Sequence, residues 1–255
     1  MRQIDPMPAF LDSAIHAARE AGALLRENFE TELSVDAALD HDIKLELDVR
    51  SQDLITRRLL ADFSDHAIYG EEGIAGNQDS PCQWIVDPID GTVNYFYGIP
   101  HFCVSIALRQ EGRLTHGVIF DPMMDELFSI EAGGVPMRNG KPIQVSSRGE
   151  LKDAIVTIGF SKSKQAMDAG MERYRTVAYQ VRKTRMMGSA ALALAYIACG
   201  RLDAYIEEQI SLWDIAAGQL LVEAAGGSIR LSDSLSHPDK WGIVAHNGKL
   251  PLDEI

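Results

Sequence analysis

The sequence predicts a mixed α/β protein whose two halves are built differently. In the first half, two stretches with apolar residues at helical spacing precede several short apolar runs joined by turns. This order is typical of helices followed by a mainly antiparallel sheet. In the second half, short apolar runs alternate with longer helical patterns, which favours an α/β arrangement. The pattern changes near residues 146–151, so we expect residues 1–148 and 149–255 to form two parts of one compact unit.

Two helices and a sheet are expected in the first half. Apolar positions recur at helical spacing over residues 8–29 and again over residues 49–63. The polar stretch between them, residues 31–48, predicts a mobile link. Short apolar runs bounded by turn-forming residues predict the strands. These strands cover residues 83–86, 102–108, 114–120 and 126–130.

Strands and helices alternate in the second half. Apolar runs predict two strands, at residues 154–158 and 202–206. Helical patterns lie between and after them, at residues 166–181, 188–199 and 212–225. The outcome expected of such alternation is a sheet covered by helices.

Composition and charge restrict the possible partners. The chain has 255 residues, of which 46% are apolar and 24% charged, as in ordinary globular proteins. Its formal net charge of −13 disfavours nucleic acid as a primary partner, because an acidic protein repels phosphate backbones. An anionic substrate would need a bound cation in the site. No apolar run approaches the roughly 18 residues of a membrane helix, so no membrane partner is expected.

The cysteines and the N-terminus indicate a cytoplasmic protein. Cys82, Cys103 and Cys199 are odd in number, far apart and without a CxxC spacing, which favours reduced thiols. The first residues lack a basic segment followed by an apolar one, so a signal peptide is not expected.

The stretch WIVDPIDGTVNYFYGIP carries the strongest local signal. An apolar run leads straight into Asp87, and the following proline is expected to end the strand because it removes a backbone donor. Asp90, Gly91 and Thr92 then form a turn in which the glycine permits positive φ. Carboxylates suit Mg²⁺ and uncovered turn amides suit phosphate oxygens. Taken alone, the pattern is more often a capping turn with two solvated acids.

Acidic residues also stand at the ends of other expected elements. Glu71 and Glu72 lie between two glycines in GEEG, after a short apolar stretch. Asp214 opens one of the expected helices, and Asp48 precedes another. Each is better explained singly as a helix cap or a surface charge, but together they favour a site for metal and phosphate.

Three motifs of the chain resemble those of the inositol monophosphatase family of metal-dependent, lithium-sensitive phosphatases. They are GEEG at 70–73, WIVDPIDGTVNYFYGIP at 84–100 and LWDIAAGQLLVEAAGG at 212–227, and the similarity extends over nearly the whole chain. The resemblance implies a layered αβαβα sandwich, a homodimer and hydrolysis of a small phosphate monoester. It also implies that a metal-activated water attacks phosphorus, without a covalent enzyme intermediate.

The resemblance further implies two to three Mg²⁺ ions per chain and a role for each matching residue. The implied ligands are Glu71, Asp87 and the Ile89 carbonyl for the first ion, Asp87, Asp90 and Asp214 for the second, and Glu71 with Asp48 for a third. The implied catalytic residues are Glu71, Thr92 and Asp90, of which Glu71 and Thr92 would orient the attacking water. The implied substrate-binding residues are Ile89, Asp90, Gly91, Thr92, Gly188, Ser189, Ala190, Glu207 and Asp214.

One region departs from the family pattern. Many members carry a lysine in a mobile loop well before the Asp48 position, whereas no lysine precedes Lys44 in this chain. The third metal region is therefore expected to be built differently. Lys44 itself is better explained as a solvated lysine of a strand than as a phosphate ligand.

The sequence leaves the substrate open. Asn94, followed by an aromatic residue, resembles the branches of the superfamily that act on inositol monophosphate or histidinol phosphate. Phosphatases of fructose 1,6-bisphosphate and of 3′-phosphoadenosine-type nucleotides share the fold and remain alternatives. Glu207 can receive either a hydroxyl group or the amine of histidinol phosphate.

Two other classes of protein are disfavoured. In haloacid-dehalogenase-type phosphatases the two aspartates of the DGT motif are two positions apart, whereas Asp87 and Asp90 are three apart. A phosphatase-like scaffold without activity, binding protein or RNA, is disfavoured because all four central acids are intact and the net charge is negative.

Overall fold

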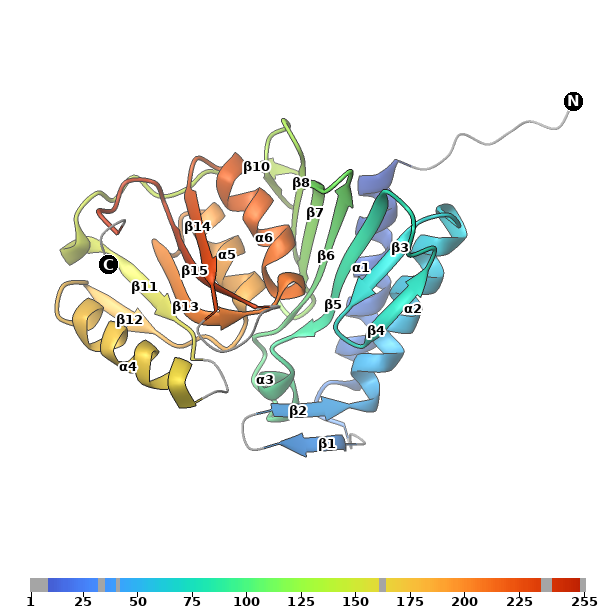
Figure 1. Cartoon of the computed structure of the whole chain (residues 1–255), viewed down its shortest axis with the longest axis horizontal. Coiled ribbons are helices and arrows are strands. Elements are labelled where there is room, and N and C mark those ends of the chain that lie inside the picture. Colours follow the sequence, from blue (N-terminus) through green and yellow to red (C-terminus); the bar gives the residue numbers. More distant parts are fainter. Residues whose placement is uncertain (1–8, 32–34, 40–41, 161–163, 235–239, 253–255) are drawn as a thin grey trace, which may run out of the picture.

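The computed structural model describes residues 9–31, 35–39, 42–160, 164–234 and 240–252, which stack in five layers (Figure 1). The order of the layers is helices, sheet, helices, sheet and helix. The predicted αβαβα sandwich is therefore confirmed. The helices are α1 (Phe10–Asn28) and α2 (Glu46–Asp62) outside the larger sheet, α5 (Ala190–Ala198) and α6 (Leu212–Ala224) between the sheets, and α4 (Lys164–Ala178) outside the smaller sheet.

Within the described ranges, the larger sheet has eight strands in the order β10-β9-β8-β7-β6-β5-β3-β4. Neighbours are antiparallel except for β3 and β5, which are parallel. This agrees with the mainly antiparallel sheet expected for the first half. The strands are β3 (Ala67–Gly70), β4 (Gly73–Gly76), β5 (Cys82–Asp90), β6 (Cys103–Gln110), β7 (Arg113–Asp121), β8 (Glu126–Glu131), β9 (Met137–Arg138) and β10 (Lys141–Pro142).

The smaller sheet, as far as the structure describes it, has five strands in the order β12-β11-β13-β15-β14. The strand β11 is parallel to both of its neighbours, whereas β15 is antiparallel to both of its own. The strands are β11 (Ile155–Ile158), β12 (Lys183–Arg185), β13 (Ala204–Ile210), β14 (Ser228–Asp233) and β15 (Trp241–His246). The predicted division into residues 1–148 and 149–255 stays a prediction.

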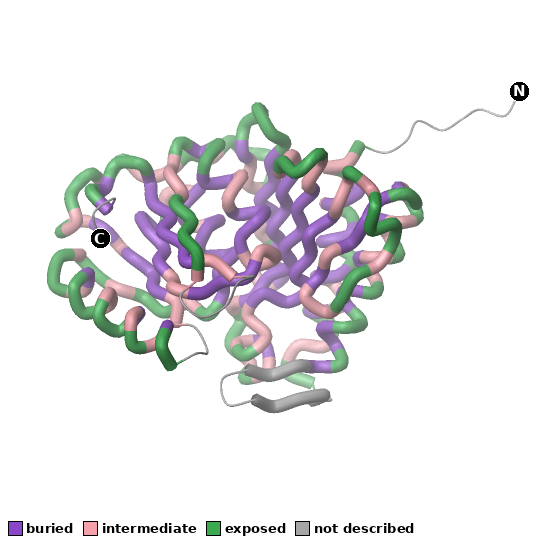
Figure 2. Tube along the Cα trace, viewed as in Figure 1, coloured by how far each residue is buried: buried purple, intermediate pink, exposed green. Residues whose placement is uncertain are grey.

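The middle helices lie between the two sheets, where α5 is buried nearly all round and α6 over about half of its residues. Every residue of α5 except Tyr196 is buried, as expected for a helix that is apolar around its whole circumference. A methyl group on Gly218 of α6 would overlap Leu194 of α5, so small residues let the two helices approach closely. Figure 2 shows this buried centre, in contrast to α4, which is exposed along much of its length.

Two expectations about the first half are wrong. The link predicted over residues 31–48 contains a separate two-stranded sheet of β1 (Val35–Leu39) and β2 (Asp42–Leu45), and α2 begins at Glu46. The strand expected to end before Pro88 continues to Asp90, with an irregularity in its pairing with β6 between Asp87 and Asp90. A proline can be accommodated in a strand at such a bulge because the backbone donor that it lacks is not needed there.

Several short or exposed elements have no counterpart in the sequence prediction. Among them are β4, β12, β14 and the short helix α3 (Thr92–Phe96). The strand β14 lies at the edge of its sheet and is largely exposed, so its residues do not show the apolar alternation of a half-buried strand. Among the described residues, no helix has both the length and the apolar character that a membrane crossing requires.

Candidate active site

A bulge at the end of β5 brings Asp87 and Asp90 to the same side of the sheet. In a regular strand, residues three positions apart point to opposite faces. Here Asp87 is paired with Ser105 and Asp90 with Cys103, so that β5 has one more residue than β6 between the two pairs. The extra residue returns Asp90 to the side of Asp87, and both carboxylates are buried, with 1% and 7% of the residue exposed.

The first turn of α5 holds the Asp90 carboxylate. The Ser189 hydroxyl donates to Oδ2 at 2.5 Å, and the backbone amides of Ala191 and Ala190 donate at 2.7 and 3.2 Å. Ser189 is also the N-cap of α5 and accepts a hydrogen bond from the Leu192 amide. These contacts favour the ionised form of Asp90, but the burial of the carboxyl is the larger effect and raises its pKa.

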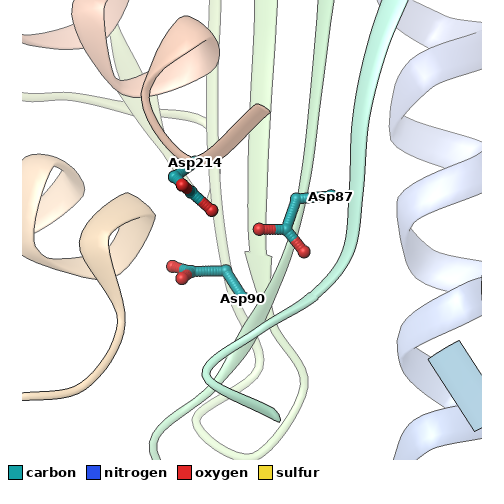
Figure 3. Close-up of side chains that lie close together, drawn as sticks. All are labelled: Asp87, Asp90 and Asp214. Atoms are coloured by element: carbon teal, nitrogen blue, oxygen red, sulfur yellow. The ribbon is translucent and has the colours of Figure 1, made fainter. Parts of the chain in front are cut away.

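Asp214 reaches the same place from α6. It is the third residue of the helix, and its Oδ2 accepts a hydrogen bond from the Ser211 amide at 2.9 Å. Asp87, Asp90 and Asp214 each place one carboxylate oxygen within 4.8 Å of the other two. Figure 3 shows the three side chains around one small space between β5 and the start of α6.

The three carboxylates have the electrostatics of a cation site. Burial raises the pKa of Asp87 well above its usual range, and the charges of Glu71, Asp90 and Asp214 raise it further. Burial, followed by the charge of Asp90, raises the pKa of Asp214 to about 7. Buried like charges are costly unless positive charge neutralises them. A set of oxygen donors alone fits a hard divalent cation such as Mg²⁺.

Glu71 lies beside this cluster, at the end of β3. Its backbone amide donates to the Val86 carbonyl at 3.1 Å, which fixes the turn against β5. The Gln52 side chain of α2 holds the same turn by accepting from the Glu72 amide at 2.9 Å and donating to the Gly73 carbonyl at 3.1 Å. A methyl group on Gly70 would overlap Gln52, which explains one of the glycines that flank the acids.

Gly91 and Thr92 form the turn that follows β5. Gly91 has a φ of 101°, and a Cβ there would lie 3.1 and 3.2 Å from the carbonyl oxygens of His101 and Gly188. The position therefore requires glycine for both conformation and space. The Thr92 hydroxyl donates to the Ile89 carbonyl at 2.9 Å, and that carbonyl keeps a second lone pair for another partner.

Asp48 lies apart from the three clustered aspartates. It is 3% exposed, and its Oδ2 accepts a hydrogen bond from the Leu45 amide at 2.8 Å at the start of α2. Its Oδ1 lies 3.5 Å from the Thr92 hydroxyl. The expected capping role is thus present, whereas the role of Asp48 as a metal ligand stays a prediction. The side chain of Lys44 lies outside the described residues.

A cavity of about 600 Å³ opens beside the carboxylates. Its wall includes all nine residues predicted to bind substrate, together with Glu71 and Asp87. Asn94 links two segments of this wall, because its side-chain amide donates to the carbonyls of His101 at 2.8 Å and Met187 at 2.9 Å. The structure therefore gathers the predicted substrate residues, from β5, the start of α5, β13 and α6, around one space.

The family assignment follows from comparison with known proteins. The chain matches the Inositol monophosphatase family over residues 8–251. It belongs to this family. The predicted resemblance is therefore confirmed, and the protein is a phosphoric monoester hydrolase.

The chain is similar to relatives with two kinds of name. It is 40% identical to inositol monophosphatase 3 of Solanum lycopersicum, with 90% of this chain and 88% of the relative covered. It is 41% identical to Nus factor SuhB of Xylella fastidiosa, with 92% and 89% covered. Among solved structures, the extragenic suppressor protein suhB of Bartonella henselae matches with a TM-score of 0.88 at 34% identity, with 94% of both chains covered.

Several residues of this inositol monophosphatase family member line the cavity without having been predicted. They include Tyr205 and Gln209 of β13, Thr157 and Gly159 of the neighbouring strand region, and Lys240. Tyr205 stands two positions before Glu207, so the two-residue period of a strand places it on the same face. That spacing is a signal by which the sequence alone identifies Tyr205. The pairing of β13 with β15 is irregular between Glu207 and Ile210, so the same period does not place Gln209.

Proposed function

We propose that the protein hydrolyses a small phosphate monoester of a polyol, such as inositol 1-phosphate, with the help of Mg²⁺. The observation that carries the proposal is the cluster of Asp87, Asp90 and Asp214 at a cavity that Glu207 also lines. The cluster suits the cations that an anionic ester requires in an acidic protein, and Glu207 offers an acceptor for hydroxyl groups.

The residues proposed to hold two ions are Asp87, Asp90, Asp214, Glu71 and the carbonyl of Ile89. Glu71 and Asp48 are proposed for a third and weaker ion. When bound, such ions supply positive charge to the phosphate oxygens and lower the pKa of a coordinated water molecule. The three clustered aspartates support the proposal most directly, because their oxygens already surround one space.

The residues around the turn after β5 are proposed to bind phosphate and orient the attacking water. The amides of Gly91 and Thr92 lie at the start of α3 and have no partner within the helix, so they can donate to phosphate oxygens. Because the Thr92 hydroxyl donates to the Ile89 carbonyl, its oxygen is left to accept a hydrogen bond from one O–H of the water. The Glu71 carboxylate accepts a hydrogen bond from the other O–H and takes up that proton as the water oxygen attacks phosphorus in line. The bond between phosphorus and the alcohol oxygen breaks, and the alcohol leaves after taking up a proton.

The alcohol half of the substrate is proposed to lie against Asp90, Glu207 and the start of α5. Asp90 is fixed by Ser189 and by two amides of α5, so the charge that faces the ester is held in one position. The name of the tomato relative supports inositol monophosphate as substrate, whereas the SuhB names leave the substrate open.

Phosphate release from a panel of esters, with and without Mg²⁺, tests the proposal. The panel contains inositol 1-phosphate, histidinol phosphate, fructose 1,6-bisphosphate and 3′-phosphoadenosine 5′-phosphate. We expect Mg²⁺-dependent turnover with a preference for the inositol ester of about 100-fold, which is ~2.7 kcal/mol of differential transition-state binding. Preference for another ester would identify that ester, in place of inositol 1-phosphate, as the substrate. The absence of phosphate release from all four esters would reject the proposed activity.

The family resemblance also supports three further proposals. We expect inhibition by lithium in the millimolar range, a homodimer and a cytoplasmic location. Light scattering of the purified protein measures the oligomeric state. Insensitivity to lithium would indicate that the departure from the family pattern before Asp48 has altered the metal arrangement.

A further inference from the structure

The carboxylate of Glu207 is held by a buried phenol. The Tyr205 hydroxyl lies 2.5 Å from Glu207 Oε2 and donates a hydrogen bond to it. Tyr205 is only 3% exposed, and its burial, followed by the charge of Glu207, raises its pKa well above the usual value. The phenol therefore keeps its proton at physiological pH and acts as a fixed donor to the carboxylate.

The alternation of β13 places Tyr205 and Glu207 on the cavity side. Tyr205 is level with Thr157 of β11, which also lines the cavity. The intervening Ile206 packs with α4 residues in another core cluster, and the following Glu208 pairs with Arg173 of α4 at 3.1 Å. The strand thus sends one face towards α4 and the other towards the substrate, as its two-residue period requires.

Gly159 makes room for the carboxylate on the neighbouring chain segment. A methyl group built on Gly159 would overlap Glu207 Oε2 and crowd the two preceding side-chain carbons. The glycine is not needed for backbone conformation, since it does not have a positive φ. Its amide donates to the Ile206 carbonyl at 2.9 Å, which holds the segment against β13. Glu207 is therefore bonded from one side and fitted into a gap on another.

From this arrangement we propose that Tyr205 and Gly159 are positioning residues that set the substrate preference. They aim the Glu207 carboxylate so that it accepts a hydrogen bond from a hydroxyl of the alcohol half, and so favour polyol monoesters over esters without hydroxyls. The inference rests on the proposed function. Direction matters here because a hydroxyl donor must meet the acceptor at hydrogen-bond distance and angle.

The test compares inositol 1-phosphate with p-nitrophenyl phosphate, which has no hydroxyl to offer. For Tyr205→Phe, we expect kcat/KM for the inositol ester to fall about tenfold, which is ~1.4 kcal/mol, with the aryl ester changed less than twofold. Gly159→Ala should act in the same direction, because the flexible Glu207 side chain is what must move. The matched control is Tyr174→Phe, which removes a phenol bonded to Thr184 outside the cavity and should change neither substrate.

A double-mutant cycle separates positioning from a general structural role. In a Glu207→Gln background, the further change Tyr205→Phe should leave the ratio of the two kcat/KM values unaltered, since there is no carboxylate left to aim. Equal losses on both substrates, or an unchanged ratio in the single variant, would overturn the inference while leaving the phosphatase activity intact. Wild-type protein that hydrolyses neither ester with Mg²⁺ would overturn the proposed function, and the inference with it.

Discussion

Two buried carboxylate centres of this protein are built in opposite ways. Asp203, at the start of the β13 region, is fully buried and surrounded by donors. Its oxygens accept from Arg148 Nε at 2.7 and 2.8 Å, from Ser146 at 2.5 Å and from the Ile155 amide at 2.7 Å. Asp87 is also buried, but its charged neighbours are Glu71, Asp90 and Asp214, all of the same sign.

The difference is the one expected between a carboxylate that stabilises the fold and one that is proposed to hold a ligand. The chain itself neutralises Asp203, which thereby links residues 146–148 to the smaller sheet. Around Asp87 the chain concentrates carboxylates whose repulsion adds to burial in raising the pKa of Asp87 and is relieved when a cation binds. A carboxylate with a guanidinium partner is thus explained by structure alone, whereas a cluster of buried carboxylates indicates a site.

The strongest test of this contrast is Asp87→Asn. We expect turnover of the preferred ester to fall about a thousandfold or more, ~4 kcal/mol in the barrier, because the residue is proposed to hold two ions. The metal-free variant should be at least as stable as the wild type, since the change removes one of several like charges. Steady-state kinetics and chemical denaturation measure the two effects.

The control for this variant is Asp53→Asn, a matched change at an exposed position of α2. It should leave both activity and stability unaltered. Full activity of Asp87→Asn would remove Asp87 from the catalytic site, and a large loss of metal-free stability would show that its charge stabilises the fold after all.

Binding of Mg²⁺ at the aspartate cluster should stabilise the wild-type protein against unfolding. For the wild type, Mg²⁺ at about 100 times its dissociation constant should raise the free energy of unfolding by ~2.7 kcal/mol. Asp87→Asn should lose most of that gain, whereas wild-type and variant melting curves without metal should be similar. Thermal unfolding with Mg²⁺ and with a chelator measures the difference, and an equal gain in both proteins would place the cation elsewhere.

Breaking the other centre should have the reverse signature. Arg148→Met removes the positive partner of a buried carboxylate and should lower the free energy of unfolding by about 2 kcal/mol. The loss is smaller than for a fully buried ion pair because the Arg148 side chain is 37% exposed. The kcat/KM below the melting transition should stay within about twofold. The control is Arg148→Lys, which keeps the positive charge but loses the planar fork of the guanidinium group. Loss of activity in a folded Arg148→Met would contradict the division of roles between the two centres.

The burial of each element explains which features the sequence predicted. The helices α1 and α2 have helical periodicity because each buries one face. The strands β5 to β8 were predicted as short continuous apolar runs, because each is buried on both faces over most of its length. The strand β14 escaped prediction because an exposed edge strand has no such face. The bulge that turns Asp90 to the side of Asp87 could not be predicted either, since Pro88 indicates a strand end as readily as a bulge.

For the candidate site, the residues were predicted mainly through motifs, whereas their supports came from the structure. Tyr205 was missed although its spacing from Glu207 places it on the same face of β13. The hydrogen bond from Ser189 to Asp90 joins residues 99 positions apart in the sequence, and no local sequence pattern specifies such a contact. Sequence reasoning therefore predicts the residues with the chemistry better than the residues that position them.

A buried base extends the comparison to a third case and gives the smallest expected effect. His66 stacks on Phe63 at 4.9 Å, and its Nδ1 has no hydrogen-bond partner among the described residues. Burial lowers the pKa of His66, although the charge of Asp65 opposes the shift. A base whose folded pKa is below the unfolded value of 6.5 contributes stability above pH 6.5 and loses it as the pH falls through the folded pKa.

The prediction concerns the difference between wild type and His66→Leu. Lowering the pH from about 8 to about 5.5 should destabilise the wild type more than the variant, by less than about 1 kcal/mol, as measured by urea denaturation at both values. His116 also faces Phe10, and its pKa is lowered by burial against the opposing charge of Glu131, so His116→Leu should show a similar difference. If the pH dependence of His66→Leu matched that of the wild type, His66 would not be kept neutral by burial. Only two kinds of buried ionisable group would then remain in the comparison: those neutralised by a partner within the chain, as Asp203 is, and those proposed to hold a ligand, as Asp87 is.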